Sequence, residues 1–546
     1  MNRTETISAA TATGESWDVI VIGGGATGLG SAVDAATRGH RTLLVEGADF
    51  GAGTSSRSTK LIHGGVRYLK QGRLGMVRQS LLERERLLQN APHLVHPVSF
   101  VLPTFRPGEL WYYFAGLRIY DMLAGSTAFA GARRLTRDEV IRRIPTLKSD
   151  GLRGGVLYAD GQFDDARMAI SLYRTLLQHG GLAFNYAPVV RLGQGSEGLK
   201  RVIVRDLESD RELTFSGRVV INATGVFADE ILRLDHQATA KPESDDLADP
   251  QAVQIAPSQG THLVLDRSYL PSDSGLMMPQ TDDGRVLFAI PWHGHVLLGT
   301  TDTAVPRICR EPQPLDSEVN YLLEHAGRYL RRQPGKADVR SMFAGLRPLV
   351  SRGAKTRLTS QLSREHQILT SDSGLITVIG GKWTTYRCMA EQVIDLAERV
   401  GSLDQRACRT RNLRLHGWSQ PGPGEAGQLP AAANPLAVYG DDAPAIQSLM
   451  DERPNLRQTL HPRLPDVAAQ VVWAARFEMA RTVADVLARR TRALFLDAAA
   501  AIEAAPTVAN LLTTELGRDP VWRDQQIAAF RALAAGYLAT DVSERL

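Results

Sequence analysis

The chain has 546 residues, of which 43% are hydrophobic and 22% are charged. This length is ample for a large buried core and for more than one domain. The net charge of +4 is far below the charge density of nucleic-acid-binding domains, which excludes that class of protein.

The sequence also indicates the redox compartment of the protein and whether it spans a membrane. Cys309, Cys388 and Cys408 have no metal-binding or redox spacing, so we expect a reducing compartment and no metal site. Residues 1–16 are polar, lack the apolar run of a signal peptide, and are predicted to form a disordered tail. No window offers about 18 uninterrupted apolar residues, so no segment is expected to span a bilayer. A cytoplasmic protein, or one attached to a membrane from the cytoplasmic side, is predicted.

The first readable unit is residues 18–46, DVIVIGGGATGLGSAVDAATRGHRTLLVE, a short apolar strand, a glycine-rich turn, a helix and a second strand. Gly23, Gly25 and Gly28 fit G-x-G-x-x-G. The first glycine makes the turn, the second lets the backbone approach a pyrophosphate, and the third lets the helix pack on the strand. The helix directs its N-terminal amides at the phosphates. A structural βαβ unit without a ligand is the alternative.

Glu46 ends the second strand, where its carboxylate can accept hydrogen bonds from an adenosine ribose. This unit alone does not distinguish NAD from FAD. The chain then continues in a long loop rich in glycine and hydroxyls, GADFGAGTSSRSTKLIHGGVRYL, instead of another regular βαβ unit. A loop of this length needs a partner that orders it, and a second pass over the same dinucleotide would supply one. Within it, Gly64 and Gly65 allow the backbone to approach a ligand closely. A solvated basic turn is the alternative.

The chain carries a series of separated motifs between about residue 17 and residue 390. They are IGGGATGLG, TSSRSTKLIHGGVRYL, SLLERERLLQNAPHL, YADGQFDDARM, INATGVFAD, GTHLVL, IPWHGHVLLGTTDT, FAGLRPLV and IGGKWTTYR. With this set the chain resembles the FAD-dependent glycerol-3-phosphate dehydrogenases of the D-amino-acid-oxidase-like flavoproteins. One departure is Phe227, where the family usually has tryptophan, which we interpret as conservative packing.

The resemblance implies which residues of the long loop meet the ligands. Those that cross the FAD are Thr54, Ser55, Ser56, Lys60, Leu61, His63 and Gly64. Arg67 and Tyr68 are similar to the substrate-side end of that loop. In the family, the strand and turn GRVVINATG close over the adenosine half of FAD, with Gly225 where a side chain would clash. A plain core strand ending in a turn is the alternative.

A second strand–glycine–helix unit, LITVIGGKWTTYRCMAEQVIDLAERV, contains Gly381, Lys382 and Thr384. Its helix N-terminus can stabilise negative charge on the flavin pyrimidine ring, and the Lys382 ammonium can serve either flavin or substrate. A helix start with a solvent-facing lysine is the alternative.

Arginines and histidines are the remaining candidates for contact with the substrate. Arg347 lies between apolar residues, which favours an inward orientation and an anionic partner. The resemblance makes it a substrate contact, with Arg364 a weaker candidate for the phosphate; an internal ion pair is the alternative for either. Removing hydride from C2 of an alcohol also requires a group that takes the hydroxyl proton. His63 and His262 are both candidates, and both are also compatible with structural roles.

The predicted fold class is α/β, with a Rossmann-like FAD-binding domain, an antiparallel-sheet substrate or cap domain, and a C-terminal helical domain. The FAD-dependent oxidoreductase domain spans 17–400. Its FAD-binding segments are about 17–105, 150–230 and 340–400, and its cap is mainly 231–340. Residues 401–436 are predicted as a linker and 437–546 as the helical domain.

The resemblance implies oxidation of sn-glycerol 3-phosphate to dihydroxyacetone phosphate, with hydride transfer to FAD and electrons passed to a quinone. Two alternatives stay open. One is an FAD-dependent oxidase or dehydrogenase of an amino or hydroxy acid, and the other is a non-catalytic flavin-binding module. The acceptor (quinone or oxygen) and the oligomeric state (monomer or homodimer) are not decided.

The stretch FRPGELWYYFAGLRIYDMLAG, residues 105–125, crowds aromatic and aliphatic side chains into a few helical turns beside Arg106 and Arg118. Such a helix is typical of a peripheral membrane contact, where a lipid-soluble quinone is accessible. Packing inside the protein is the alternative.

Overall fold

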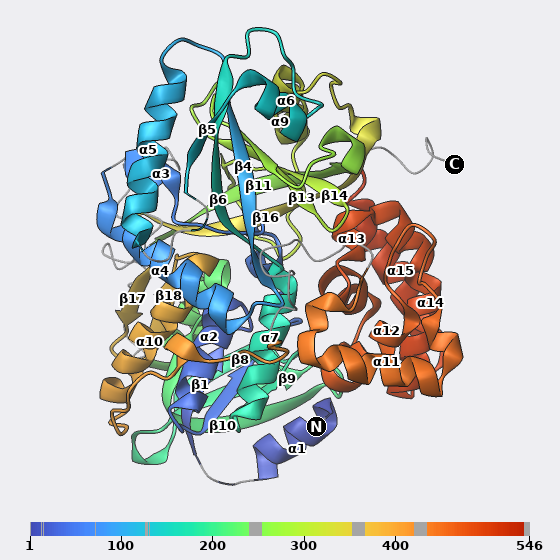
Figure 1. Ribbon diagram of the computed structural model, residues 1–546. Coiled ribbons are helices and arrows are strands. Elements are labelled where there is room, and N and C mark those ends of the chain that lie inside the picture. Colours follow the sequence, from blue (N-terminus) through green and yellow to red (C-terminus); the bar gives the residue numbers. More distant parts are fainter. Residues whose placement is uncertain are drawn as a thin grey trace.

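The computed structural model describes residues 2–12, 14, 16–70, 72–125, 129, 131–239, 254–351, 366–419 and 434–539. Two sheets stand one above the other in Figure 1, and the C-terminal helices lie beside both. The first sheet and the C-terminal helices share one continuous apolar core.

The first sheet is built around buried parallel strands. Its strand order is β17–β18–β10–β1–β2–β7, with β9 pairing β10 and β8 pairing β9. The strands are β1 (Trp17–Ile22), β2 (Thr42–Val45), β7 (Leu182–Phe184), β8 (Val189–Gln194), β9 (Lys200–Asp206), β10 (Arg211–Asn222), β17 (Gln367–Thr370) and β18 (Ile376–Ile379). β18, β10, β1, β2 and β7 run parallel, and their apolar runs suit strands covered on both faces.

Helices cover the first sheet. α2 (Ala26–Thr37) packs against both α7 (Asp165–Gln178) and α10 (Tyr386–Val400). Because parallel strands place their carboxyl ends at one edge, the turns after β1, β2, β10 and β18 meet there. This edge faces the second sheet (Figure 1).

The second sheet has the order β15–β11–β14–β13–β12–β4–β6–β3, with β16 pairing β11 and β5 pairing β6. The strands are β3 (Leu61–Ile62), β4 (Val95–Thr104), β5 (Arg133–Leu135), β6 (Gly154–Phe163), β11 (Gln254–Asp266), β12 (Gly275–Met278), β13 (Leu287–Trp292), β14 (His295–Gly299), β15 (Thr303–Ala304) and β16 (Val339–Ser351). The sequence-based division placed β4, β6 and β16 among the FAD-binding segments. The structure instead places them in the second sheet, because β16 pairs with β11 and β4 pairs with β12, both strands of the predicted cap, and β6 joins through β4.

Helices flank the second sheet and connect it to the first. They are α3 (Val66–Lys70), α4 (Leu74–Asn90), α5 (Glu109–Ala124), α6 (Arg137–Arg143) and α9 (Asp316–Tyr329). α8 (Ala228–Thr239) instead packs against β8 and β18 of the first sheet. The antiparallel pair β11 and β16 is the most important for the site. Its register sets Ser258 opposite Arg347 and His262 opposite Phe343.

The described residues from 437 onward are mainly helical. They include α11 (Ala443–Glu452), α12 (Ala468–Phe477), the π-helical turn η12 (Asp485–Arg490), α13 (Ala493–Leu496), α14 (Ala498–Leu516) and α15 (Pro520–Ala535). Within the predicted linker, residues 401–419 are described. There the Leu415 N–H donates to the carbonyl of Asn90, the last residue of α4.

The N-terminus corrects one prediction. Residues 3–12, expected in a disordered tail, form the helix α1 (Arg3–Ala12). The Arg3 side chain is buried, forms an ion pair of 2.5 Å with Asp206, and donates to the Asn185 carbonyl. A composition that is polar and rich in Ala and Thr gives no sign of this long-range contact.

Candidate active site

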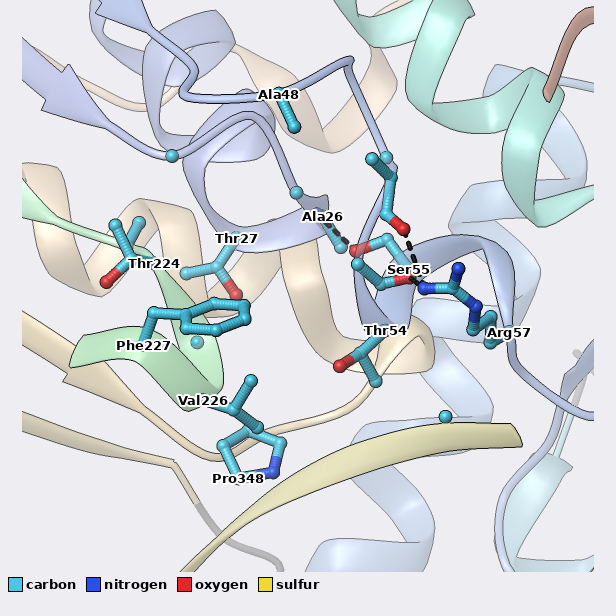
Figure 2. A pocket seen from close by; sticks show the side chains of 18 of the residues that line it. Ala26, Thr27, Ala48, Thr54, Ser55, Arg57, Thr224, Val226, Phe227 and Pro348 are labelled. Atoms are coloured by element: carbon cyan, nitrogen blue, oxygen red, sulfur yellow. Dashed lines mark hydrogen bonds between the residues drawn. The ribbon is translucent and has the colours of Figure 1, made fainter. Parts of the chain in front are cut away.

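The cradle predicted for a pyrophosphate lies where β1 turns into α2. Gly23 has a φ of +109°, and a Cβ there would lie 2.7 Å from the Ala223 carbonyl oxygen. α2 begins at Ala26, directly after Gly25, and the Ala26 N–H donates to Ser55 Oγ over 2.9 Å. Turn and helix N-terminus border a cavity of about 630 Å³ (Figure 2). A helix N-terminus in this position favours an anionic ligand.

Glu46 lies in the wall of the same cavity. Its carboxylate accepts from the Gly24 N–H at 2.5 Å and from the Ala48 N–H at 2.7 Å. Burial raises the pKa of Glu46, and these two backbone hydrogen bonds oppose the rise. Because a carboxylate oxygen has two lone pairs, each still has room for a hydroxyl donor such as a ribose. Gly28 does not line the cavity; it lets α2 approach the Gly23 carbonyl, where a Cβ would collide.

The loop after β2 crosses the cavity and is fixed from both sides. Thr54, Ser55, Leu61 and His63 line the cavity, whereas Ser56, Lys60 and Gly64 do not. In η1 (Thr54–Ser56), Thr54 Oγ1 donates to the Leu346 carbonyl over 2.5 Å. The Ser55 carbonyl accepts from Trp383 Nε1 over 2.8 Å. These bonds tie the loop to β16 and to the turn after β18.

Lys60, predicted at the cofactor, anchors the loop from behind instead. Its side chain is fully buried, and its ammonium lies 2.7 Å from both Asp165 oxygens and 2.6 Å from the Ser56 carbonyl. Three aromatic rings surround it. Burial lowers the pKa of Lys60, and Asp165 opposes this. Its charge is neutralised inside the protein.

The turn after β10 forms η4 (Gly225–Phe227), and both end residues line the cavity. Figure 2 shows Val226, Phe227 and Pro348 together along one side of the pocket. The predicted clash of a side chain at Gly225 with FAD stays a prediction. Among the described residues, no atom beyond its two chain neighbours lies within 4 Å of a Cβ built on Gly225, but its φ is +63°. Glycine is therefore favoured there by backbone conformation.

Arg347 enters the cavity from β16, with 23% of its side chain exposed. Its Nη2 donates to the Thr301 carbonyl at 3.1 Å and to Thr300 Oγ1 at 3.3 Å, and Nη1 lies 3.6 Å from Asp302. Gly260 on the neighbouring strand makes room for it, since a Cβ there would lie 2.7 Å from the guanidinium carbon. The guanidinium is thus held between two strands with one side toward the cavity.

His262 is buried beside this guanidinium and lines the cavity. Its Nε2 lies 2.9 Å from Thr59 Oγ1, and its ring stacks on Phe343 with centroids 5.0 Å apart. Burial, together with the positive charges of Arg347 and Lys60, holds the pKa of His262 well below its ordinary value. The imidazole is therefore neutral at pH 7.

Lys382, Tyr68 and His63 line another part of the cavity. The Lys382 ammonium donates to Ser80 Oγ over 2.7 Å and lies 5.2 Å from the centre of the Tyr68 ring. The His63 N–H donates to Thr384 Oγ1 over 3.3 Å. The long loop and the turn after β18 therefore meet, as the repeated strand–glycine–helix pattern suggests.

Two predicted substrate contacts fall outside what the structure describes. Arg67 lies in α3, but its side chain is not among the described atoms, and Arg364 lies in the segment 352–365, outside the described residues. Gly381 lines the cavity with a φ of +88°.

Some cavity residues were not selected from the sequence. They are Thr59, Gly260, Arg310, Trp383 and Arg489. Thr59, Gly260 and Trp383 lie inside the motifs quoted above, close to residues that were predicted, so the motifs could have identified them. Arg310 and Arg489 carry no such signal, because arginine is common throughout this chain.

A family model described as FAD dependent oxidoreductase matches residues 18–387, more than half of the chain. The chain belongs to this family. A second model, described as the C-terminal domain of alpha-glycerophosphate oxidase, matches residues 376–526 of this FAD-dependent oxidoreductase.

Curated relatives match over nearly the whole chain. A probable mitochondrial glycerol-3-phosphate dehydrogenase from Caenorhabditis elegans is 39% identical and covers 92% of this chain and 71% of its own length. Mitochondrial glycerol-3-phosphate dehydrogenase from Homo sapiens is 37% identical, with coverages of 94% and 72%. The solved glycerol-3-phosphate dehydrogenase from Bacillus halodurans, complexed with FAD, superposes with a TM-score of 0.76 at 26% identity, covering 98% of this chain and 97% of that one. The predicted fold class and the FAD cofactor are confirmed.

The residues present fit FAD. Gly23 and Gly25 line the cavity beside the N-terminus of α2, and the Glu46 carboxylate in the same wall has lone pairs left for a hydroxyl donor. Among the described residues, no group of three His, Cys, Asp or Glu side chains is arranged to hold a metal ion.

Proposed function

We propose that this FAD-dependent oxidoreductase oxidises sn-glycerol 3-phosphate to dihydroxyacetone phosphate and passes the electrons to a quinone. The observation that carries the proposal is that Arg347, His262, Lys382 and Tyr68 line the same cavity as the dinucleotide cradle. When bound, FAD supplies the acceptor for the hydride from C2 of the substrate. The names of the relatives support this substrate.

Arg347 and Lys382 provide the positive charge for an anionic substrate. Both ammonium and guanidinium groups are fixed by hydrogen bonds to Ser80 and to the Thr300–Thr301 segment. A fixed arginine binds a phosphoryl group or stabilises the oxygen that loses its proton, with no need for reorganisation. A phosphoryl contact predicts that loss of Arg347 raises KM, and an oxygen contact predicts that it lowers kcat.

His262 provides the proton acceptor in this proposal. As a neutral imidazole it can accept the hydroxyl proton while the hydride leaves from C2. Its Nδ1 has no hydrogen-bond partner among the described residues. His63 is the alternative acceptor. His262→Asn is expected to remove the ascending limb of the kcat pH profile, and the same loss in His63→Asn alone would transfer the role to His63.

The substrate is tested by anaerobic reduction of the bound flavin. We expect bleaching of the yellow flavin by sn-glycerol 3-phosphate, and none by glycerol, glycine or lactate at equal concentration. Bleaching by an amino or hydroxy acid instead would identify the alternative oxidase or dehydrogenase. No bleaching by any of them, with dithionite still reducing the flavin, would indicate a non-catalytic flavin-binding module.

We also propose that the protein works at the cytoplasmic surface of a membrane, where a quinone is accessible. No helix within the described part of the chain is long and apolar enough to span a bilayer. α5 offers a different kind of contact. Trp111 and Met122 are 59% and 76% exposed, and Tyr112 and Ile119 are exposed beside them. Such a row of apolar side chains on one helix face suits the boundary between lipid headgroups and chains.

The predicted membrane helix divides into two faces. Leu117 and Tyr120 are buried against the second sheet and α4, so the alternative of internal packing holds for this face. Figure 1 shows α5 along an outer edge of the molecule. Arg106, just before α5, and Arg118, within it, are both exposed and can reach anionic lipid.

Co-sedimentation with liposomes containing anionic lipid tests this contact. The double variant Trp111→Glu, Met122→Glu is expected to lose binding and keep its flavin. Val521→Glu on α15 is the matched control, because Val521 is 64% exposed on another helix. Equal binding of wild type and the double variant would remove α5 as the membrane contact.

A further inference from the structure

The C-terminal helical region forms part of the wall of the FAD cavity. Thr482, Ala484, Arg489 and Leu533 line it together with residues of the turn after β2. Three of these four lie in or just before η12, a π-helical turn. A π-helical turn is rare and often marks a functional position.

An ion cluster joins η12 to the turn that follows Glu46. Asp49 is buried there, three residues after Glu46. Its Oδ2 accepts from Arg489 Nε at 2.5 Å and also from Arg490 Nη1, and its Oδ1 accepts from Arg490 Nη2 at 2.9 Å. Burial raises the pKa of Asp49, but the two arginines more than offset this and hold it below its ordinary value. The carboxylate is therefore charged, and the arginines are its partners.

A second connection runs through Asp485. Asp485 accepts from Arg489 Nη2 and from the Tyr186 hydroxyl, each at 2.6 Å. Tyr186 also lines the cavity, and its N–H donates to the Ala48 carbonyl over 2.8 Å. Arg489 thus contacts the turn 46–49 directly, and supports it again through Asp485 and Tyr186.

The turn held in this way carries the cofactor contacts. Glu46 accepts from the Gly24 and Ala48 amides, and Gly24 belongs to the pyrophosphate cradle. Displacing Asp49 would therefore displace both the ribose carboxylate and the cradle. FAD also brings negative charge into a wall that already contains Glu46 and Asp49, and Arg489 is a cavity-lining cation beside them.

We propose that Arg489 is a cofactor-positioning residue, through which the C-terminal helical region retains FAD in the catalytic domain. Arg490 shares this task from a fully buried position, where it also donates to the Glu478 carbonyl over 2.6 Å. The proposal rests on FAD binding alone and is independent of the substrate and the electron acceptor.

The test compares Arg489→Gln, Arg489→Lys and Asp49→Asn as purified holoenzymes. FAD release on dilution gives the dissociation constant, and the melting temperature is recorded with and without added FAD. We expect Arg489→Gln to weaken FAD binding at least about tenfold and to lose most of the stabilisation that added FAD confers. Arg489→Lys should recover part of the affinity, because it keeps the charge but not the planar guanidinium.

Arg476→Gln is the matched control. Arg476 forms an exposed ion pair with Glu515 at 2.6 Å in the same helical region, away from the cavity lining. This variant is expected to keep wild-type FAD affinity. If Arg489→Gln and Asp49→Asn lower the melting temperature but leave FAD affinity unchanged, the cluster only joins the two regions and the proposal is overturned. If Arg489→Gln does not fold, unchanged affinity in Arg489→Lys and Asp49→Asn overturns it equally.

Discussion

Adding one methyl group at Gly260 is expected to disable Arg347 by displacing its guanidinium. A Cβ there would lie 2.7 Å from the Arg347 Cζ and 2.8 Å from its Nη1, so the guanidinium must withdraw. Normal contact requires a displacement of about 1 Å, and a displacement of that size at a reacting centre costs about 100-fold in rate. The move also breaks the bond to the Thr301 carbonyl. We expect Gly260→Ala to lower kcat/KM about 100-fold while the flavin spectrum stays unchanged.

The assay is anaerobic stopped-flow reduction of the flavin by glycerol 3-phosphate. Gly116→Ala on α5 is the control, because among the described residues only the backbone of its own helix lies near a Cβ built there. Arg347→Ala alone is expected to lose about 2 to 5 kcal/mol of transition-state binding. The double variant Gly260→Ala, Arg347→Ala should have nearly the same kcat/KM as Arg347→Ala alone, because the guanidinium that the new methyl group would displace is absent. Additive losses would refute this reasoning, since Gly260 would then act through something other than Arg347.

Gly25→Val is expected to yield colourless protein, because a branched side chain would enter the cradle; full flavin content would contradict the assignment. Burial and the charge of Arg167 lower the pKa of His93 to about 3, so its contribution to stability is present above pH 6.5 and lost as the pH falls toward 3. Between pH 7 and pH 5, the free energy of unfolding of His93→Gln should therefore fall by about 2 kcal/mol less than that of wild type, as measured by urea unfolding. Tyr120→Phe should destabilise by about 1 to 3 kcal/mol, because the buried Gly64 N–H loses its acceptor at 2.7 Å. Tyr158→Phe is its buried control, and equal urea midpoints for the two would show that this bond contributes nothing.

Local patterns were sufficient for the cofactor cradle. Gly23, Gly25 and Glu46 are positioned by neighbours in the same βαβ unit, so spacing along the chain already defines their arrangement. Arg347 and His262 needed more. They are 85 residues apart by number and meet because β11 and β16 pair in one register, which no local pattern reports. The motifs identified both residues, but not the strand pairing that joins them.

The errors have a common physical origin in long-range contacts. β4, β6 and β16 were assigned to the wrong layer because strand composition does not reveal which sheet a strand joins. Arg3 and Lys60 were misjudged for a similar reason. Each is a charged residue that is buried by a carboxylate far away in the sequence, Asp206 for the first and Asp165 for the second. A basic residue in a polar stretch looks solvated or ligand-binding until that partner is known.

The basic side chains Arg57 and Lys60 of the loop 55–69 pair with protein carboxylates, which the composition of the loop does not suggest. Lys60 is neutralised by Asp165, and Arg57 forms an ion pair with Glu311 at 2.6 Å. These two charges hold the loop in place, so we expect the backbone and the helix N-terminus after Gly25 to bind the cofactor pyrophosphate. Arg347 comes from a different sheet and keeps one side toward the cavity. Under the proposed function, this arrangement would leave the Arg347 charge available to the phosphorylated substrate.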